Sequence, residues 1–283
     1  MSDTERVVSL YAIGNTKKRS VKKPLLPVAA IAISVYTIVM TRGILIAGNK
    51  SALTSAIEAE AAKRVERYAV ALLPDRSRNG PQIRETTKKG LLARGENVLP
   101  ESSAAQSSAK ETGISLDWNP GSPISARTLI IAAENRFDQI DEAILVCDPP
   151  SVRYAAVDLT LTDIEVLVND HIKGWLFLVK ELAAVFKARE KGTMALVYSE
   201  TSGAGGKDDV TDLLGPVALA AFRSLVRGLL DTALNEPYFT LGFSGADTGD
   251  EAGFAAFIFK QLEEGNRRSN GKLYKYGKLG FFR

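Results

Sequence analysis

The chain has 283 residues, of which 45% are hydrophobic and 24% are charged, and its formal net charge at pH 7 is +3. This composition is that of a globular protein and excludes a disordered chain, a collagen-like repeat and a small disulfide-stapled protein. The single cysteine, Cys147, can form neither an internal disulfide nor a metal cluster, which favours a reducing compartment and a cytoplasmic location. The single histidine, His171, argues against a histidine-based zinc site and a Ser-His-Asp triad. The net charge is too small to indicate nucleic-acid binding.

A basic cluster followed by an apolar stretch sets the first 42 residues apart. Lysines and an arginine gather within 17–23, and the apolar stretch covers 25–40. This order resembles a signal peptide or a membrane anchor, but about 16 apolar residues fall short of the ~20 that a spanning helix needs. Because 31–39 is rich in β-branched residues, we expect residues 1–42 to form a soluble arm or an extra strand that holds a protein partner. Membrane association through 25–41 and a cleaved signal peptide are the alternatives.

Alternating strands and helices are predicted from Gly43 onward. Short apolar runs predict strands that are buried on both faces, and longer segments of helical periodicity predict the helices between them. The predicted strands are 43–47, 68–73, 143–146, 194–198, 238–243 and 272–278, and the predicted helices are 51–67, 123–138, 161–189, 214–234 and 251–264. A polar, serine-rich stretch at 76–112 predicts a long insertion. The fold class predicted for 43–283 is therefore α/β, a doubly wound parallel sheet with an N-terminal extension.

The turn after the first strand is the place where such folds bind a dinucleotide phosphate, because the following helix supplies free N–H groups and a positive dipole there. The candidate contacts are Gly48, Asn49, Lys50 and Ser51. Ala52 and Thr54 stand where glycines normally let the phosphate and the neighbouring strand come close. A phosphate site and a plain strand-to-helix turn are both open at this point.

Five local segments resemble the short-chain dehydrogenase/reductase family. They are 136–141 before a strand, 170–174 at the opening of the central helix, 192–199 at the strand with the catalytic serine, 218–230 in the helix of the Tyr-x-x-x-Lys pair, and 270–274 before the last strand. Their order and spacing carry the resemblance. It implies a Rossmann fold over 43–283, NAD or NADP as the cofactor, and a homodimer or larger assembly through helices 161–189 and 214–234.

The resemblance also implies cofactor contacts outside the first turn. Asp75 would accept a hydrogen bond from a ribose hydroxyl of NAD, whereas Arg76 and Arg78 would instead hold the 2′-phosphate of NADP. A solvated turn is the alternative for these three residues. Asp117 matches an acidic position that caps the adenine. Cys147 begins the Cys-Asp-Pro-Pro loop that replaces the family's Asn-Asn-Ala-Gly loop, and its prolines remove backbone donors.

The catalytic residues of the family are mostly missing. The tyrosine position falls on Gly215 and the lysine position on Leu219, so the proton-carrying phenol and the cation that tunes it are both replaced. Ser199 matches the serine, and His171 falls at the asparagine; Tyr198 cannot substitute for the missing tyrosine, because adjacent strand residues face opposite sides. We expect a catalytically degenerate reductase-like protein, a pseudoenzyme that serves as a binding, assembly or regulatory module. The alternative is a divergent NAD(P)H-dependent oxidoreductase that uses Ser199 and His171.

Overall fold

The computed structural model describes residues 42–64, 67–74, 113–149, 153–154, 156–200, 211–246, 249–265 and 268–277. The predicted N-terminal arm, apart from Arg42, lies outside these residues. So do the predicted insertion at 76–112 and the cofactor candidates Asp75, Arg76 and Arg78.

A seven-stranded sheet forms the centre of the described residues, with the strand order β3-β2-β1-β4-β6-β8-β9. Every pairing in it is parallel. Its strands are β1 (Gly43–Gly48), β2 (Arg67–Leu72), β3 (Gly113–Ser115), β4 (Glu142–Cys147), β6 (Thr193–Ser199), β8 (Phe239–Gly245) and β9 (Leu273–Tyr276). A separate antiparallel ribbon pairs β5 (Arg153–Tyr154) with β7 (Thr211–Asp212).

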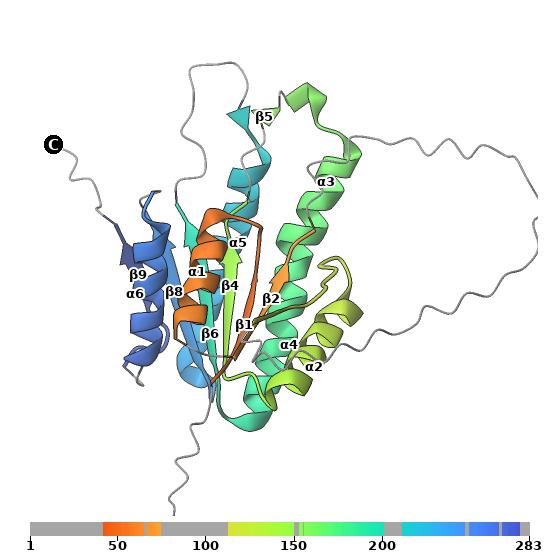
Figure 1. Ribbon diagram of the computed structural model, residues 1–283. Helices are drawn as coiled ribbons and strands as arrows, with labels where there is room; N and C mark the ends of the chain where they lie inside the picture. The colour runs from red at the N-terminus through yellow and green to blue at the C-terminus, as the bar shows by residue number, and fades with distance from the viewer. Residues whose placement is uncertain are drawn as a thin grey trace, which may run out of the picture. The chain divides into compact units, whose positions relative to one another are not determined.

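Helices cover both faces of the sheet, as Figure 1 shows. They are α1 (Ala52–Lys63), α2 (Pro123–Phe137), α3 (Leu161–Val168), the π-helix η2 (Asn169–Lys173), α4 (Gly174–Arg189), α5 (Leu214–Thr232) and α6 (Glu251–Glu263), with short 3-10 turns η1 (Ala156–Asp158) and η3 (Ala233–Asn235). Helices α2, α4 and α5 pack on one face and α1 and α6 on the other. Because parallel strands need such crossovers, the two layers of helices follow from the strand order.

The strands β1 and β4 in the middle of the sheet are buried on both faces. All residues of β1 and β4 are buried, and apart from Glu142, which pairs with Arg42 at the start of β4, these strands are continuous runs without polar alternation. Leu45 and Leu145 belong to the core under α2, α4 and α5, whereas Ile44 and Ile144 belong to the core under α1 and α6. Burial on both faces fixes the register of the sheet, because a slip by one residue would exchange the two cores.

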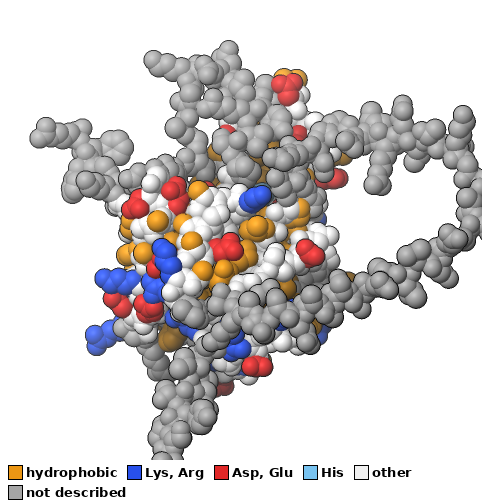
Figure 2. Space-filling view, in the orientation of Figure 1, with side chains coloured by type: hydrophobic (Ala, Val, Ile, Leu, Met, Phe, Trp, Pro, Cys, Tyr) orange, Lys and Arg blue, Asp and Glu red, His pale blue; other side chains and the backbone are white. Residues whose placement is uncertain are grey.

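Charged side chains connect α1 and α6 on the solvent side of the layer that these two helices form. Arg64 forms ion pairs with Glu60 and Glu263, and its guanidinium lies 5.0 Å from the ring centroid of Phe259. Figure 2 shows Lys or Arg and Asp or Glu side chains intermixed over the α6 side of this face. Such an exposed mixture is typical of a solvated surface and supplies little stability by itself.

The predicted fold class is confirmed, with several local corrections. The predicted helix 51–67 stops at Lys63, because Arg67 already begins β2. The predicted helix 161–189 is α3 and α4 with a π-helical turn between them. Strands β3, β5 and β7 were not predicted, because segments of two or three residues are too short for periodicity to detect. Among the described residues, no helix has both the length and the apolar character needed to cross a bilayer.

Candidate functional site

The candidate site lies where the order in which strands are added to the sheet reverses. From β1 the strand order runs outward through β2 on one side and through β4 on the other. In open α/β sheets the crevice outside the carboxyl ends of two such strands is the usual place for a ligand. The residues at these ends are Gly48 and Asn49 after β1, and Cys147 and Asp148 after β4.

Gly48 and Ser51 shape the turn between β1 and α1. A Cβ atom at Gly48 would lie 2.9 Å from both the Cβ and the carbonyl oxygen of Val146 on β4, so only glycine fits this close approach. Ser51 is the N-cap of α1, and its Oγ accepts a hydrogen bond from the backbone N–H of Thr54 at 3.2 Å. The buried Thr54 side chain lies beside it, with its Oγ1 3.2 Å from the Oγ of Ser51. The space between β1 and α1 is therefore filled by a side chain.

Asn49 and Asp148 join the ends of β1 and β4. The backbone N–H of Asp148 donates a hydrogen bond to Oδ1 of Asn49 at 3.3 Å, and Asn49 is only 6% exposed. The Asp148 carboxylate in turn hydrogen-bonds the side chain of Ser51. A chain of polar contacts thus crosses the crevice from one strand end to the N-terminus of α1.

The carboxyl group of Asp148 places a titratable acid in the crevice, and its pKa is raised above the ordinary value. Burial raises the pKa of its carboxyl, the hydrogen bond with Ser51 opposes that rise, and the negative charge of Glu251 at the start of α6 adds to it. Two carboxylates therefore face the region where a phosphate group would need positive potential. These residues do not fit the diphosphate of a dinucleotide.

The other predicted cofactor residues do not converge on this crevice. Lys50 is exposed in the β1–α1 turn. Asp117 is exposed beyond β3, two strands away from β1 in the sheet. Cys147 is fully buried, and burial strongly raises the pKa of its thiol, so the thiol is an unreactive part of the core. Of the predicted cofactor residues that the structure describes, Gly48, Asn49 and Ser51 contribute the close approach, the hydrogen bond and the helix cap at the switch point.

His171 lies in the π-helical turn η2, which the sequence did not reveal. Burial lowers the pKa of its imidazole to about 4, so the ring is neutral at physiological pH. Within the described part of the chain, its Nδ1 atom is buried without a hydrogen-bond partner. Single π-helical turns of this kind often occur at functional sites.

Ser199 ends β6 and does not meet His171. The alternation of β6 places Tyr198 in the core under α4 and α5, and Ser199 therefore faces α6. Its register partner Gly245 supports this, because a Cβ there would lie 2.8 Å from the ring of Phe254 on α6. His171 lies in η2, which packs against α4 and α5, so the two predicted catalytic side chains lie on opposite faces of the sheet.

The start of α5 shows what replaces the tyrosine and lysine implied by the resemblance. Gly215 and Leu219 are both buried, and Leu219 belongs to the core. A Cβ atom added at Gly215 would meet the side chain of Asp212, which precedes the helix. Oδ1 of Asp212 accepts a hydrogen bond from the backbone N–H of Gly215 at 2.9 Å, whereas its Oδ2 is buried without a hydrogen-bond partner in the described chain. Asp212 was missed, although an acidic residue just before a helix is a capping signal.

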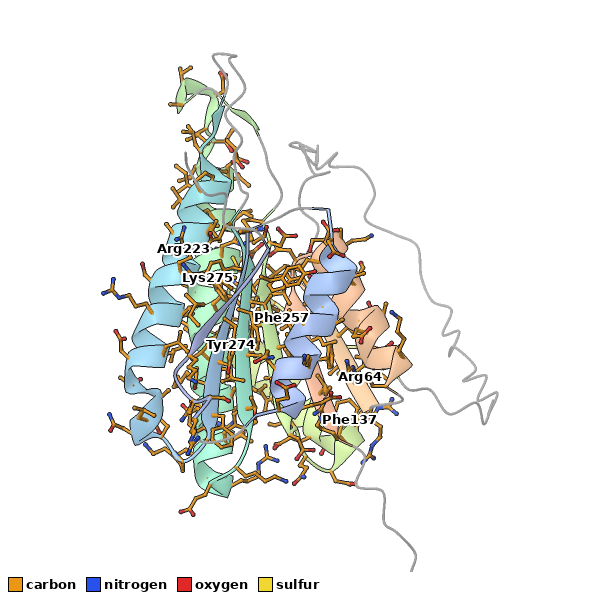
Figure 3. The ribbon with its side chains drawn as sticks, turned by 90° about the vertical axis from the view of Figure 1, so that its left-hand side faces the viewer. Arg64, Phe137, Arg223, Phe257, Tyr274 and Lys275 are labelled. Atoms are coloured by element: carbon orange, nitrogen blue, oxygen red, sulfur yellow. The ribbon has the colours of Figure 1, made fainter. Side chains whose placement is uncertain are left out.

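A polar row on the α5 face of the sheet was also missed. Tyr198, Ser244 and Lys275 are register partners on β6, β8 and β9. The Tyr198 hydroxyl hydrogen-bonds Ser244 and Arg223, and the Arg223 guanidinium lies 5.7 Å from the Tyr198 ring centroid. Burial raises the pKa of the Tyr198 phenol, so Tyr198 is a satisfied core residue and not an activated phenol. Figure 3 shows Arg223 and Lys275 at the same level of this edge.

Several solved structures similar to this chain are short-chain dehydrogenases or reductases. A short chain dehydrogenase from Bacillus anthracis str. 'Ames Ancestor' matches 83% of this chain and 95% of its own, with 11% identity and a TM-score of 0.59. An NADH-dependent reductase complexed with NAD matches 83% and 94%, with 13% identity and a TM-score of 0.58. A short chain dehydrogenase from Mycobacterium smegmatis matches 85% and 94%, with 10% identity and a TM-score of 0.57. No protein-family model and no curated protein sequence matches the chain.

Proposed function

We propose that this chain, which has the fold of the short-chain dehydrogenases/reductases, is a catalytically degenerate member that works as a binding, assembly or regulatory module. The observation that carries the proposal is the start of α5. Gly215 and Leu219 are buried, and the space beside Gly215 is held by the Asp212 carboxylate, which accepts a hydrogen bond from the Gly215 backbone N–H. These positions offer no phenol and no ammonium group, and a carboxylate cannot lower the pKa of a neighbouring acid.

The crevice supports the same proposal independently of α5. Thr54 fills the gap between α1 and β1, and Asp148 with Glu251 supplies negative charge where a cofactor phosphate would bind. Losing a general acid alone lowers a rate by ~10²–10⁴. In this chain the tyrosine and lysine that would act on the substrate are replaced by Gly215 and Leu219. The crevice that would hold the cofactor phosphate contains Thr54 and Asp148.

Titration of the full-length protein with NADH and NADPH tests this proposal. Both tryptophans of the chain, Trp118 and Trp175, are buried with their ring centroids 5.7 Å apart, and their fluorescence reports on the core beside η2. We expect no saturable signal below 1 mM (on the order of −4 kcal/mol) and no oxidation of NADH with a panel of ketones and aldehydes. Sub-millimolar binding together with turnover would contradict the proposal.

A second function rests on His171. A neutral imidazole in a π-helical turn could act as a general base, so a divergent NAD(P)H-dependent oxidoreductase that uses His171 and Ser199 is the competing assignment. The placement of the two side chains on opposite faces disfavours it. If NADH oxidation is found, Ser199→Ala and His171→Gln should abolish it, and the control Ser224→Ala, on the exposed side of α5, should not.

We also propose that copies of the chain assemble through α4 and α5. Leu176 on α4 is 50% exposed and Val217 on α5 is 49% exposed, and a Cβ added at Gly228 would meet nothing within 4 Å. Exposed apolar side chains on neighbouring helices can become the centre of an interface. Sedimentation analysis should show an oligomer that Leu176→Glu with Val217→Glu converts to a monomer. Ile131→Glu on α2, where Ile131 is 48% exposed, is the matched control and should leave the assembly intact.

A further inference from the structure

We propose that Asp148 is the residue by which this crevice excludes phosphate-bearing ligands. Its carboxylate takes the place of an external anion at the N-terminus of α1. This inference deepens the proposed function, since it names the residue that keeps the dinucleotide crevice closed to its ordinary class of ligand.

The geometry brings Asp148 to this position from two sides. Its backbone N–H is bound by Oδ1 of the buried Asn49, which fixes the end of β4 against the end of β1. Its carboxylate hydrogen-bonds Ser51, the N-cap of α1. The N-terminus of a helix is where a phosphate would bind, so the contact with Ser51 places a carboxylate of the chain itself beside that position.

The surrounding charges strengthen the exclusion. Glu251 lies at the start of α6 and acts on Asp148 as a like charge. Because a phosphate carries one to two negative charges, it would add to two carboxylates in a half-buried crevice, where repulsion is screened less than in water. Removal of the charge at Asp148 should therefore help phosphate binding more than removal of the charge at Glu251.

Isosteric substitutions in the full-length protein test the inference, with inorganic pyrophosphate and NADH as the probes. Calorimetric titration should show that Asp148→Asn binds pyrophosphate at least tenfold more tightly than the wild type, with a smaller gain for Glu251→Gln. Asp231→Asn removes a similar charge from an exposed position near the end of α5, and it should behave as the wild type. In Asp148→Asn, the backbone amide resonances of residues 49–54 should move when pyrophosphate is added.

The possible outcomes separate this inference from the proposed function. If the wild type binds neither probe and Asp148→Asn and Glu251→Gln also fail to bind, the role of Asp148 is wrong while the proposed function stands. Pyrophosphate that binds Asp148→Asn without moving the resonances of residues 49–54 also overturns the inference. Tight NADH binding by the wild type would overturn both. If Asp148→Asn does not fold, Glu251→Gln is the deciding variant. Pyrophosphate binding by Glu251→Gln equal to that of the wild type would contradict the repulsion between the carboxylates and phosphate.

Discussion

The backbone N–H of Asp148 donates a hydrogen bond to Oδ1 of Asn49 at 3.3 Å, and this contact ties the carboxyl ends of β4 and β1 together across the switch point of the sheet. Asn49→Ala would leave the Asp148 N–H unpaired in a half-buried crevice. We expect a loss of about 1–3 kcal/mol in the free energy of unfolding, measured by urea denaturation. Asn119→Ala removes an exposed asparagine that accepts from Gly121 at 3.2 Å, and it is the control that should cost less.

Gly48 should tolerate no side chain. Gly48→Ala places a Cβ atom 2.9 Å from Val146 on β4, in a strand that is buried along its whole length. Overpacking of this kind costs about 1–3 kcal/mol, seen as a lower urea midpoint. Gly228→Ala is the opposite case, because a Cβ there has open space in an α-helix, and it should stabilise the protein by about 0.4–1 kcal/mol. Equal effects of the two substitutions would show that the strand approach at Gly48 is looser than described.

His171 should make the protein less stable in mild acid. Burial lowers its pKa to about 4 in the folded protein from an ordinary value of 6.5. Between these two pH values the unfolded chain binds more protons, so the contribution of His171 to stability is complete above pH 6.5 and is lost as the pH falls towards 4. Thermal unfolding of wild type and His171→Gln should show a melting temperature that falls less steeply with acid in the variant. Parallel curves would mean that His171 is solvated.

The thiol of Cys147 should not react with thiol reagents until the protein unfolds. It is the one cysteine in the sequence, it is 0% exposed, and burial raises the pKa of its thiol far above the normal range. A thiol reagent such as Ellman's reagent should therefore label no group in the native protein and one group in denaturant. Fast labelling of the native protein would show that the end of β4 opens in solution.

The sequence predicted the fold well, for physical reasons that apply to particular segments. The apolar runs at 43–47 and 143–146 are strands buried on both faces, and only this environment requires continuous apolar residues. The π-helical turn at His171 could not be predicted, because its residues have the same composition as an ordinary helix.

The site was predicted only in part. Gly48, Asn49 and Ser51 were found because backbone approach and helix capping depend on residues close in sequence. The contact between Asp148 and Asn49 spans 99 positions, and no local pattern indicates it. The burial of Gly215 and Leu219 likewise depends on the rotation of α5 against the sheet, which packing determines.

The π-helical turn between α3 and α4 also has a consequence for insertions and deletions. It accommodates the residues Asn169–Lys173 in a wider turn than an α-helix would. Such a turn fits one more residue into about the same total rotation, so the helices on either side keep their facing. Removing one residue there should let the segment wind as a single α-helix, with Leu167 still buried and Ile164 still exposed. Single-residue deletions confined to these five positions should therefore be tolerated better than deletions elsewhere in α3 or α4.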